Sequence, residues 1–432
     1  MNKKNLKDKK VESKIIIRPQ DLVSKPFISC PKCKKDNQFG VLMINRNSYV
    51  RRCNNCMYSE SYDLPGLEKK VIYLDQMAIS NMMNAINSSS SVKGDLGKWR
   101  LLFEKLDRLV KLQLIVCPYS PIHEEESVVT TVYKDLRQMY QHLSNGVSFY
   151  SSDVVIRFQL YIAFMKWLNK DVEDITIGDI VHGDINEWQN RIRVSVNLKR
   201  DKNKDYVKDV TRHRDILSWG LVHLFNYWKK EKGKKFDTWF KREINSFGRA
   251  YWEAYCRLAL SDDAIELMNY TTSQQSILVA ELSNILRKGG LDNEEEIFIK
   301  LGNFFKSEQV KEIPYVQLFS MLDAALANQT ANGGRTQPPN QGTHNDLTMI
   351  ATYTPYCDAL FIDNAFRETI KQGEKHLGLD IYNKFYSQSN FKEFLDYLDK
   401  IESEAPRELI LKVKEVYGEE WVNAFVTMYN KR

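Results

Sequence analysis

Four of the seven cysteines are arranged in two pairs whose spacing could bind a metal ion. Cys30 and Cys33 form one CxxC pair. Cys53 and Cys56 form the other, and nineteen residues separate the two pairs. Each CxxC turn presents two thiolates, and Zn²⁺ prefers four such ligands in a tetrahedron. A redox-active dithiol is the alternative, but the doubled motif favours structural zinc.

Acidic residues follow two short apolar segments that are typical of buried strands. The segment 71–74 ends on Asp75, and the segment 359–362 ends on Asp363. In an open α/β sheet, ligands bind at the carboxyl ends of the strands, where both carboxylates would lie. An Asp in this position can also cap the helix that follows it. The first segment alone supports both interpretations equally, and its repetition by the second favours a cation site.

The apolar segment 114–117 leads into a predicted helix that carries three consecutive glutamates. Glutamates in the first turn of a helix interact favourably with its dipole, which is a sufficient reason for all three. Which of Glu124, Glu125 and Glu126 points inward is left open by the sequence. We choose Glu126 because it shares a helix face with His123.

The remaining elements must position these acids. Residues 39–44 and 48–52 predict a hairpin between the two cysteine pairs, and residues 150–310 are predicted to be mostly helical. The segment 331–345 contains three glycines and no core-forming residue, so we expect a flexible loop. A helix resumes where this loop ends, at Asn345 and Asp346.

The length of 432 residues is enough for two or three domains, and a hydrophobic content of 43% allows a sizeable core. The sequence contains no run of 18 apolar residues, so no transmembrane helix is predicted. The basic N-terminus lacks the apolar core of a signal peptide. We therefore expect a cytoplasmic protein without a membrane partner.

The net charge of +6 is unevenly distributed. Residues 1–18 carry a net +5 and residues 191–250 a net +10, which leaves −9 for the remainder. Basic segments joined to an acidic remainder are typical of nucleic-acid enzymes whose acids bind a metal. The tail, residues 1–24, serves either as a solubility segment or as a phosphate-binding arm.

Basic residues alternate with aromatic residues between positions 219 and 247. This composition could hold a single strand through its phosphates and through base stacking. The alternative, which we favour for most of the aromatic residues, is a helix pair with buried rings and a solvated basic face. Arg51 and Arg52, beside the second cysteine pair, could contact RNA, DNA or a protein. The basic candidates in the helical segment are Lys229, Lys230, Lys234, Lys235, Lys241 and Arg242.

The order of these motifs resembles that of PIN-like nucleases. YLDQMAIS is similar to the first strand of that family with its leading Asp. PYSPIHEEES resembles the second strand and the helix bearing a Glu, and HNDLTMIATYTPYCDALFIDNAF resembles the helix–strand pair with the last two acids. The segment with the cysteines resembles a zinc ribbon.

The resemblance covers residues 70–143 and 340–432, and it implies an α/β fold with a PIN-like parallel sheet flanked by helices. A large helical insertion would interrupt the nuclease domain. The implied domains are a basic flexible tail (1–24), a zinc ribbon (25–66), a PIN-like nuclease domain in two parts (70–149 and 311–432) and the insertion (150–310).

The resemblance also implies the site. Its ligands for Mg²⁺ or Mn²⁺ would be Asp75, Glu126, Asp346 and Asp363. His123, Asn345 and Asn364 would surround the ligands, although we expect His123 mainly to fix its helix.

A zinc ribbon ahead of a split PIN-like domain further resembles the ring-activated zinc-finger RNases of bacterial antiphage defence. That resemblance implies an endoribonuclease that a phage protein activates, that cleaves cellular RNA and that arrests growth. An assembly of identical subunits is compatible with it. One alternative is a non-catalytic nucleic-acid or protein-binding module on a degenerate nuclease scaffold. Another is a DNA flap nuclease.

Overall fold

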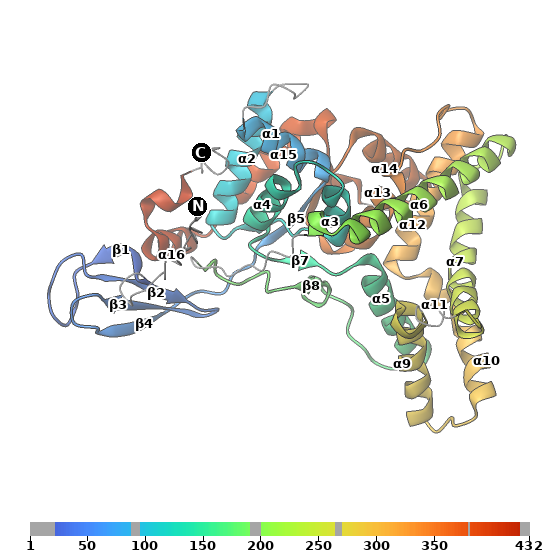
Figure 1. Ribbon diagram of the computed structural model, residues 1–432, viewed down its shortest axis with the longest axis horizontal. Coiled ribbons are helices and arrows are strands. Elements are labelled where there is room, and N and C mark those ends of the chain that lie inside the picture. The colour runs from blue at the N-terminus through green and yellow to red at the C-terminus, as the bar shows by residue number, and fades with distance from the viewer. Residues whose placement is uncertain (1–21, 88–95, 191–199, 264–269, 379–380, 424–432) are drawn as a thin grey trace, which may run out of the picture. The chain divides into compact units, whose positions relative to one another are not determined.

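The computed structural model describes residues 22–87, 96–190, 200–263, 270–378 and 381–423 (Figure 1). The chain has an α/β fold and divides into two compact units. Unit 1 comprises residues 1–67, 186–194 and 405–423. Unit 2 comprises residues 68–185, 195–404 and 424–432. The predicted basic tail lies almost entirely outside the described residues.

Unit 1 contains an antiparallel four-stranded sheet in the order β1-β2-β3-β4. β2 and β3 pair directly, with Ile44 opposite Tyr49 and Phe39 opposite Cys53, which confirms the predicted hairpin. The hairpin returns the chain so that the second cysteine pair meets the first. The strands are Ser24–Ile28 (β1), Phe39–Ile44 (β2), Ser48–Cys53 (β3) and Ser59–Asp63 (β4).

Unit 1 also includes two segments from later in the chain. The residues 405–423, predicted as part of the nuclease domain, belong to this unit and contain helix α16 (Arg407–Tyr417). The hydroxyl of Tyr417 donates to the carbonyl of Gln189 at 2.6 Å. Trp188 is buried, and its Nε1 donates to the carbonyl of Pro65 at 3.0 Å. Unit 1 is therefore assembled from distant parts of the sequence.

Unit 2 contains a parallel sheet in the order β10-β9-β5-β6. Tyr73 lies opposite Leu360 in the β5–β9 pairing, so the two apolar segments form neighbouring strands as predicted. Ile72 and Tyr73 are successive residues of β5, so their side chains point to opposite faces, and both are at most 1% exposed. Both faces of the sheet are therefore covered. The strands are Lys70–Leu74 (β5), Ile115–Val116 (β6), Ala359–Phe361 (β9) and Phe385–Tyr386 (β10).

Helices cover this sheet and continue into a large helical region (Figure 1). A short antiparallel pair, β7 (Ser148–Phe149) and β8 (Val181–His182), interrupts it. None of the described helices is both long and apolar enough to cross a membrane. The helices of unit 2 are α1 (Gln76–Ile86), α2 (Leu96–Lys111), α3 (Pro121–Val128), α4 (Tyr133–Ser144), α5 (Ser152–Trp167), α6 (Lys204–Lys230), α7 (Phe236–Ala259), α9 (Gln274–Lys288), α10 (Glu294–Phe305), α11 (Glu308–Lys311), α12 (Pro314–Ala331), α13 (Thr343–Tyr353), α14 (Asn364–Leu377) and α15 (Phe391–Ser403).

The sheet and the helical region share one hydrophobic core, which contains both Tyr73 of β5 and Trp228 of α6. Helix α12 lies within this core and packs against α6, α7, α13 and α14. A Cβ atom at Gly373 of α14 would lie 2.6 Å from Cγ of Met321 on α12, so only glycine permits this close approach. The packing positions the helix that begins directly after Asp363.

Candidate functional site

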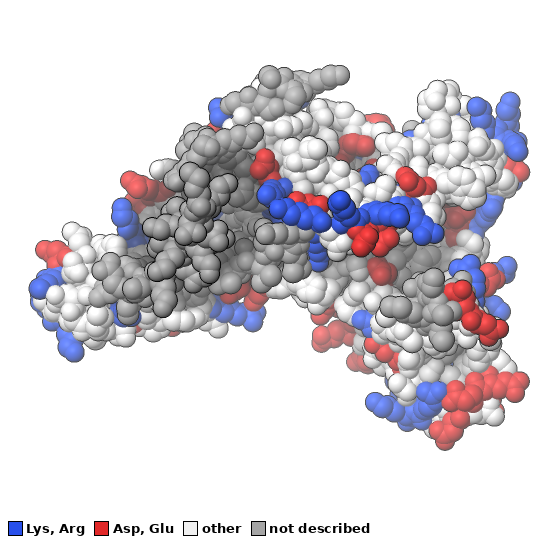
Figure 2. All heavy atoms as spheres, viewed as in Figure 1, with Lys and Arg blue, Asp and Glu red and all other residues white. Residues whose placement is uncertain are grey.

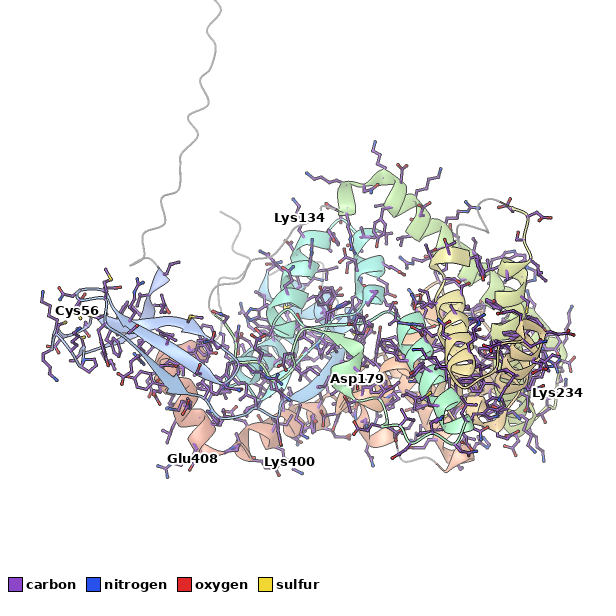
Figure 3. The ribbon with its side chains drawn as sticks, turned by 90° about the horizontal axis from the view of Figure 1, so that it is seen from below. Cys56, Lys134, Asp179, Lys234, Lys400 and Glu408 are labelled. Atoms are coloured by element: carbon purple, nitrogen blue, oxygen red, sulfur yellow. The ribbon has the colours of Figure 1, made fainter. Side chains whose placement is uncertain are left out.

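The four cysteines of unit 1 form a compact cluster in which all sulfur atoms lie within 4.8 Å of one another. The sulfur atoms of Cys30 and Cys56 are 3.7 Å apart, as are those of Cys33 and Cys53. A tetrahedral ion with Zn–S bonds of about 2.3 Å separates its sulfur ligands by about 3.8 Å. The cluster therefore has the dimensions of a four-thiolate zinc site, with Cys56 at one end of unit 1 (Figure 3).

The backbone around the cysteines favours thiolates. The N–H of Cys33 donates to Sγ of Cys30 at 3.4 Å, and the N–H of Cys56 donates to Sγ of Cys53 at the same distance. The backbone N–H of Lys35 contributes most to lowering the pKa of Cys33, to about 6. The backbone of Tyr58 lowers the pKa of Cys56 in the same way, but burial and the three neighbouring sulfur atoms outweigh it and raise that pKa to about 11. These donors stabilise negative charge on sulfur, which is the form that binds zinc.

Arg51 does not lie on a nucleic-acid surface of unit 1. Its side chain is buried, and its guanidinium donates to the carbonyls of Pro26 at 2.9 Å and Glu415 at 2.8 Å. It also donates to the carbonyl of Phe39 at 3.2 Å. Arg51 therefore stabilises the fold of unit 1, which corrects its predicted role. Arg52, on the other face of β3, is half-buried.

Two of the predicted acids in unit 2 lie together at one edge of the sheet. Asp75 comes directly after β5, and Asp363 is the second residue after the end of β9. The backbone N–H of Asp75 donates to the carbonyl of Phe361, the last residue of β9, at 2.9 Å. Because neighbouring parallel strands end at the same edge, the strand pairing brings these carboxyl groups close.

Two helices bring the other predicted acids to the same place. Glu126 extends from α3, and Asp346 lies in the first turn of α13. Asp346 interacts electrostatically with all three other carboxyl groups, and Asp75 interacts with Glu126 and Asp363. We call Asp75, Glu126, Asp346 and Asp363 the acid cluster.

Burial and the charges of neighbouring carboxyl groups make Asp75, Glu126 and Asp346 hard to ionise. Burial, followed by repulsion from Glu126 and Asp363, raises the pKa of Asp75 to about 7. The pKa of Asp346 lies well above its usual value for the same reasons, with burial again the largest cause. Burial also raises the pKa of Glu126. The protein thus gathers several half-buried carboxyl groups whose neutral forms are favoured until a cation binds, and such perturbed groups are typical of functional sites.

Polar and basic groups partly offset this charge. Nδ2 of Asn345 donates to Oε1 of Glu126 at 3.2 Å, and Arg214 of α6 lowers the pKa of the same glutamate. Arg335 interacts with a second acid of the cluster: burial lowers the pKa of Arg335, and the charge of Asp363 opposes that change. Two guanidinium groups therefore lie close enough to interact with the acid cluster.

The structure distinguishes the three glutamates of α3. Glu126 alone interacts with Asp75 and Asp346. Glu124 accepts a hydrogen bond from the hydroxyl of Tyr133 and lies 3.7 Å from Arg200. Glu125 is partly buried and interacts mainly with His213, which opposes the rise in its pKa that burial causes.

The helix-capping alternative applies to one of the strand-end acids. Oδ1 of Asp363 accepts from the N–H of Phe366 at 2.7 Å and so caps α14. Asp75 occupies the N-cap position of α1, but its side chain makes no capping hydrogen bond of normal geometry. The nearby N–H groups of Gln76 and Met77 only lower its pKa slightly against the effect of burial. Capping therefore does not account for Asp75.

His123 and Asn364 have structural contacts. Nδ1 of His123 accepts from the N–H of Ser120 at 3.1 Å, and its ring stacks between Tyr73 and Tyr140 at 4.9 and 4.7 Å. Burial lowers its pKa to about 3, so the ring is neutral and fixes α3, as expected. Oδ1 of Asn364 accepts from the N–H of Ser389 at 2.9 Å.

The acid cluster is more open than the cysteine cluster. Within the described ranges, the four cysteines are the only group of three or more His, Cys, Asp or Glu side chains whose ligand atoms all lie within 4.8 Å of one another. The carboxyl groups are therefore close enough to interact but do not form a closed ligand set. Mg²⁺ is often held by one or two carboxylates, with water and substrate phosphate as its other ligands.

In the predicted basic helix pair, α6 and α7, several aromatic rings are buried and most of the basic side chains are exposed. Phe225, Trp228, Phe236 and Trp239 are buried, so these rings form core and do not offer a stacking surface. Lys and Arg side chains gather where α6 meets α7 (Figure 2). The exposed basic residues there are Lys229, Lys230, Lys232, Lys235, Lys241 and Arg242.

Two of the basic residues predicted to bind nucleic acid have partners within this surface. Lys234, at the loop after α6, pairs with Glu231 at 2.5 Å and lies 5.2 Å from the ring centroid of Trp239 (Figure 3). The Nη1 atom of Arg242 donates to the hydroxyl of Tyr227 at 2.8 Å. The helix-pair interpretation of this segment is therefore correct for most of its rings, and a basic face remains exposed.

Comparisons with known proteins leave the family open: a scan of protein-family models, a search of curated proteins and a search of solved structures each found no match. The PIN-like resemblance therefore stays a prediction from the motifs. Arg214 and Arg335 were missed because nothing in the sequence around them differs from other basic residues. Only the folded chain places them beside the acids.

Proposed function

We propose that the chain is a metal-dependent endoribonuclease whose active site is the acid cluster. The observation that carries the proposal is the convergence of four acids, from two strand ends and two helices, at one edge of a parallel sheet. Burying several carboxyl groups together is unfavourable because each disfavours ionisation of the others. A chain that retains such an arrangement has a use for the combined charge.

The donor atoms fit a hard divalent cation, because the cluster offers only oxygen ligands. Bound there, Mg²⁺ or Mn²⁺ would lower the pKa of a water molecule and neutralise charge on a phosphodiester. Asp75, Glu126, Asp346 and Asp363 would hold the ion directly or through water. The open spacing leaves positions for substrate oxygens.

Other residues of the chain orient the site. Asn345 donates to Glu126 and so leaves the second carboxylate oxygen free to turn toward the ion. Asp363 uses one oxygen to cap α14, which fixes the direction of its other oxygen. Arg214 and Arg335, whose charges interact with Glu126 and Asp363, would bind phosphate oxygens of the substrate.

We choose RNA as the substrate and a partner protein as the activator because of the order of the motifs and the zinc ribbon that precedes them. Under this proposal the protein is a defence effector that cleaves cellular RNA after a phage protein engages it, and growth then stops. The zinc ribbon and the exposed basic face near Lys229 would contribute to recognition of the partner and of RNA.

The test is cleavage of labelled total RNA, and of branched DNA beside it, with Mg²⁺ or Mn²⁺. Each reaction is run with and without lysate from phage-infected cells. Asp75→Asn and Asp363→Asn should each abolish RNA cleavage, and Asn at position 363 retains the helix cap. Asp396→Asn, an exposed residue of α15, serves as the control. Wild-type cleavage by both variants of the acid cluster would overturn the proposal, and cleavage of branched DNA alone would reassign the substrate.

A second function is favoured by the open spacing of the acids. A degenerate scaffold that only binds nucleic acid or a protein would keep the fold without a competent ion site. Calorimetry with Mn²⁺ separates the two: under the nuclease proposal, binding is present in the wild type and lost in Asp346→Asn. The binding-module hypothesis predicts no such site in either protein.

A further inference from the structure

A hollow of about 670 Å³ lies in unit 2 beside the first turns of α3. Its walls come from α3, α4, α5 and α9, from the β7–β8 pair and from Arg200. Hollows of this size commonly bind small organic molecules. It is separate from the acid cluster, since none of the four acids lines it.

The charges of the hollow fit an anion. Arg137, Arg157 and Arg200 line it, and Glu124 is the one acid among its lining residues. Nη1 of Arg157 pairs with Glu281 at 2.6 Å, but its Nε is buried and has no hydrogen-bond partner in the described part of the chain. Guanidinium groups bind phosphate oxygens well because they present several donors in one plane.

The other lining groups fit a base. Tyr150 and Phe158 line the hollow, and the Arg157 guanidinium lies 4.9 Å from the ring centroid of Phe158. Gln274, the first residue of α9, also lines it, and Oε1 of this side chain is buried without a hydrogen-bond partner among the described residues. A buried acceptor without a donor is unfavourable until a ligand supplies one. Exocyclic amino groups of nucleobases are such donors.

The hollow is connected to the acid cluster through α3. Glu124 lines the hollow, whereas Glu126 belongs to the acid cluster. Residues two apart on an α-helix point in nearly opposite directions, so the two sites lie on opposite sides of one helix, roughly 10–12 Å wide. A strand of a few nucleotides can span that width.

The hollow also continues along the helical region. A second hollow of about 490 Å³ shares Arg157 and Phe158 with the first and extends between α5 and α9 to Lys288. The two hollows adjoin at Arg157 and Phe158, and arginines, a lysine and aromatic rings line them, with Glu281 paired to Arg157. Grooves of this composition track single-stranded nucleic acids.

We propose that the hollow beside α3 binds one nucleotide unit, with its phosphate on Arg157 and Arg200 and the amino group of its base on Gln274. Resting on the proposed nuclease function, this site holds a nucleotide of the RNA substrate a short distance from the bond that is cut. The helical region then supplies the substrate path. The same chemistry suits a free nucleotide, and the experiment below distinguishes the two.

Binding is measured with the full-length Asp75→Asn variant and without added Mg²⁺ or Mn²⁺, so that no cleavage occurs and the cysteine site keeps its metal. Fluorescence anisotropy reports on labelled single-stranded oligo(A), oligo(C) and oligo(U), and calorimetry reports on AMP, CMP and UMP. Arg200→Ala should weaken oligonucleotide binding about tenfold. Gln274→Leu should remove a preference of about 3- to 10-fold for oligo(A) and oligo(C) over oligo(U), which lacks an amino group.

Arg249→Ala is the matched control, because Arg249 is exposed on α7 and lines neither hollow. Unchanged oligonucleotide binding and base preference in both hollow variants would overturn the proposal, even if RNA cleavage is intact. If the wild-type protein cleaves no RNA but the two hollow variants still lose oligonucleotide binding, the binding site in the hollow is supported and the nuclease proposal is rejected. Tight binding of a mononucleotide, with no gain for the oligonucleotide, would identify a free nucleotide as the ligand and overturn the substrate path.

Discussion

The cysteine cluster of unit 1 and the acid cluster of unit 2 both gather side chains of types that bind cations, but in different arrangements. The four sulfur atoms lie within 4.8 Å of one another, and backbone N–H groups support the thiolates. The four acids interact strongly but do not meet this distance, and arginines flank them. A closed ligand set leaves no position for a substrate, whereas an open one does. The first site therefore suits a role in stabilising the fold, and the second is available for chemistry.

The two sites should also differ in their relation to stability. Four thiolates would complete the coordination of a zinc ion, so the ion would contribute directly to folding. The acids repel one another in the folded chain, so without a bound cation they reduce its stability. Breaking the first site should therefore unfold part of the chain, and neutralising the second should stabilise it.

The largest expected effect is the loss of zinc from unit 1. The double variant Cys33→Ser/Cys56→Ser removes one ligand from each pair, and bound zinc should fall from about one per chain to near zero. Because structural zinc contributes roughly 10–16 kcal/mol in small zinc modules, unit 1 should unfold. Elemental analysis gives the zinc content, and hydrogen exchange should show faster exchange in β2 and β3 while the core of unit 2 stays protected.

Cys256→Ser is the control for that experiment, since Cys256 is on α7 and outside the cluster. It should retain zinc and protection of β2 and β3. A double variant that still binds one zinc per chain would contradict the assignment of the four-thiolate site.

The next effect is a gain of stability when Asp75 is neutralised. Its pKa is raised from 3.8 to about 7 in the folded chain, so folding is penalised once pH exceeds the unfolded value. The penalty grows between about pH 4 and 7 and is complete above that. Asp75→Asn should therefore raise the free energy of unfolding by about 2 to 4 kcal/mol at pH 8 without added Mg²⁺ or Mn²⁺.

Urea denaturation at pH 8 and pH 5 measures this effect, and the gain should be smaller at pH 5. Mn²⁺ should stabilise the wild type and not the variant, because the ion offsets the repulsion only where the carboxylates can bind it. Asp396→Asn, on the surface of α15, should change neither measurement. A variant less stable than the wild type at pH 8 would show that Asp75 is a structural group.

The two sites differ as much in what the sequence reveals about them. The cysteine site follows from local spacing, because each CxxC turn positions its own two ligands. Asp75 and Asp363 could be predicted because each ends a strand-like segment, and the β5–β9 pairing confirms those strands. The choice of Glu126 depended on a shared helix face with His123, and the structure brings this glutamate to the other acids.

Long-range packing was not predictable in the same way. Arg51 lies in a basic dipeptide, and its sequence neighbours do not show that its guanidinium is hydrogen-bonded to backbone carbonyls. One of these carbonyls belongs to Glu415, far away in the sequence. Arg214 and Arg335 lie within a basic helix and a glycine-rich loop, where their neighbours have the same composition. Their approach to Glu126 and Asp363 depends on how α6, α12 and α13 pack, which no local pattern encodes.

These two arginines add a further difference between the sites, because the donors to the cysteine sulfur atoms among the described residues are backbone N–H groups and the amide of Asn55. Arg335→Gln and Arg214→Gln should each reduce RNA cleavage about 10- to 100-fold if their guanidiniums bind phosphate oxygens. Zinc content and the unfolding midpoint should change little. Arg212→Gln, two residues from Arg214 and exposed on α6, should cleave like the wild type. Wild-type cleavage rates in all three variants would show that neither Arg214 nor Arg335 contributes to catalysis.

The smallest effect should come from the basic face where α6 ends. Lys229 and Lys230 are exposed, and the nearby Trp228 and Trp239 are buried, so this surface offers charge without base stacking. The double variant Lys229→Gln/Lys230→Gln should weaken RNA binding only a few-fold. The slope of the logarithm of the binding constant against the logarithm of the salt concentration should become shallower by about 0.7 for each phosphate that the variant no longer neutralises. Anisotropy titrations between low and physiological salt measure the slope, with Lys234→Gln as the comparison because Lys234 already pairs with Glu231. An unchanged slope would remove this face from the RNA path and leave the groove between α5 and α9 as the surface that binds the strand.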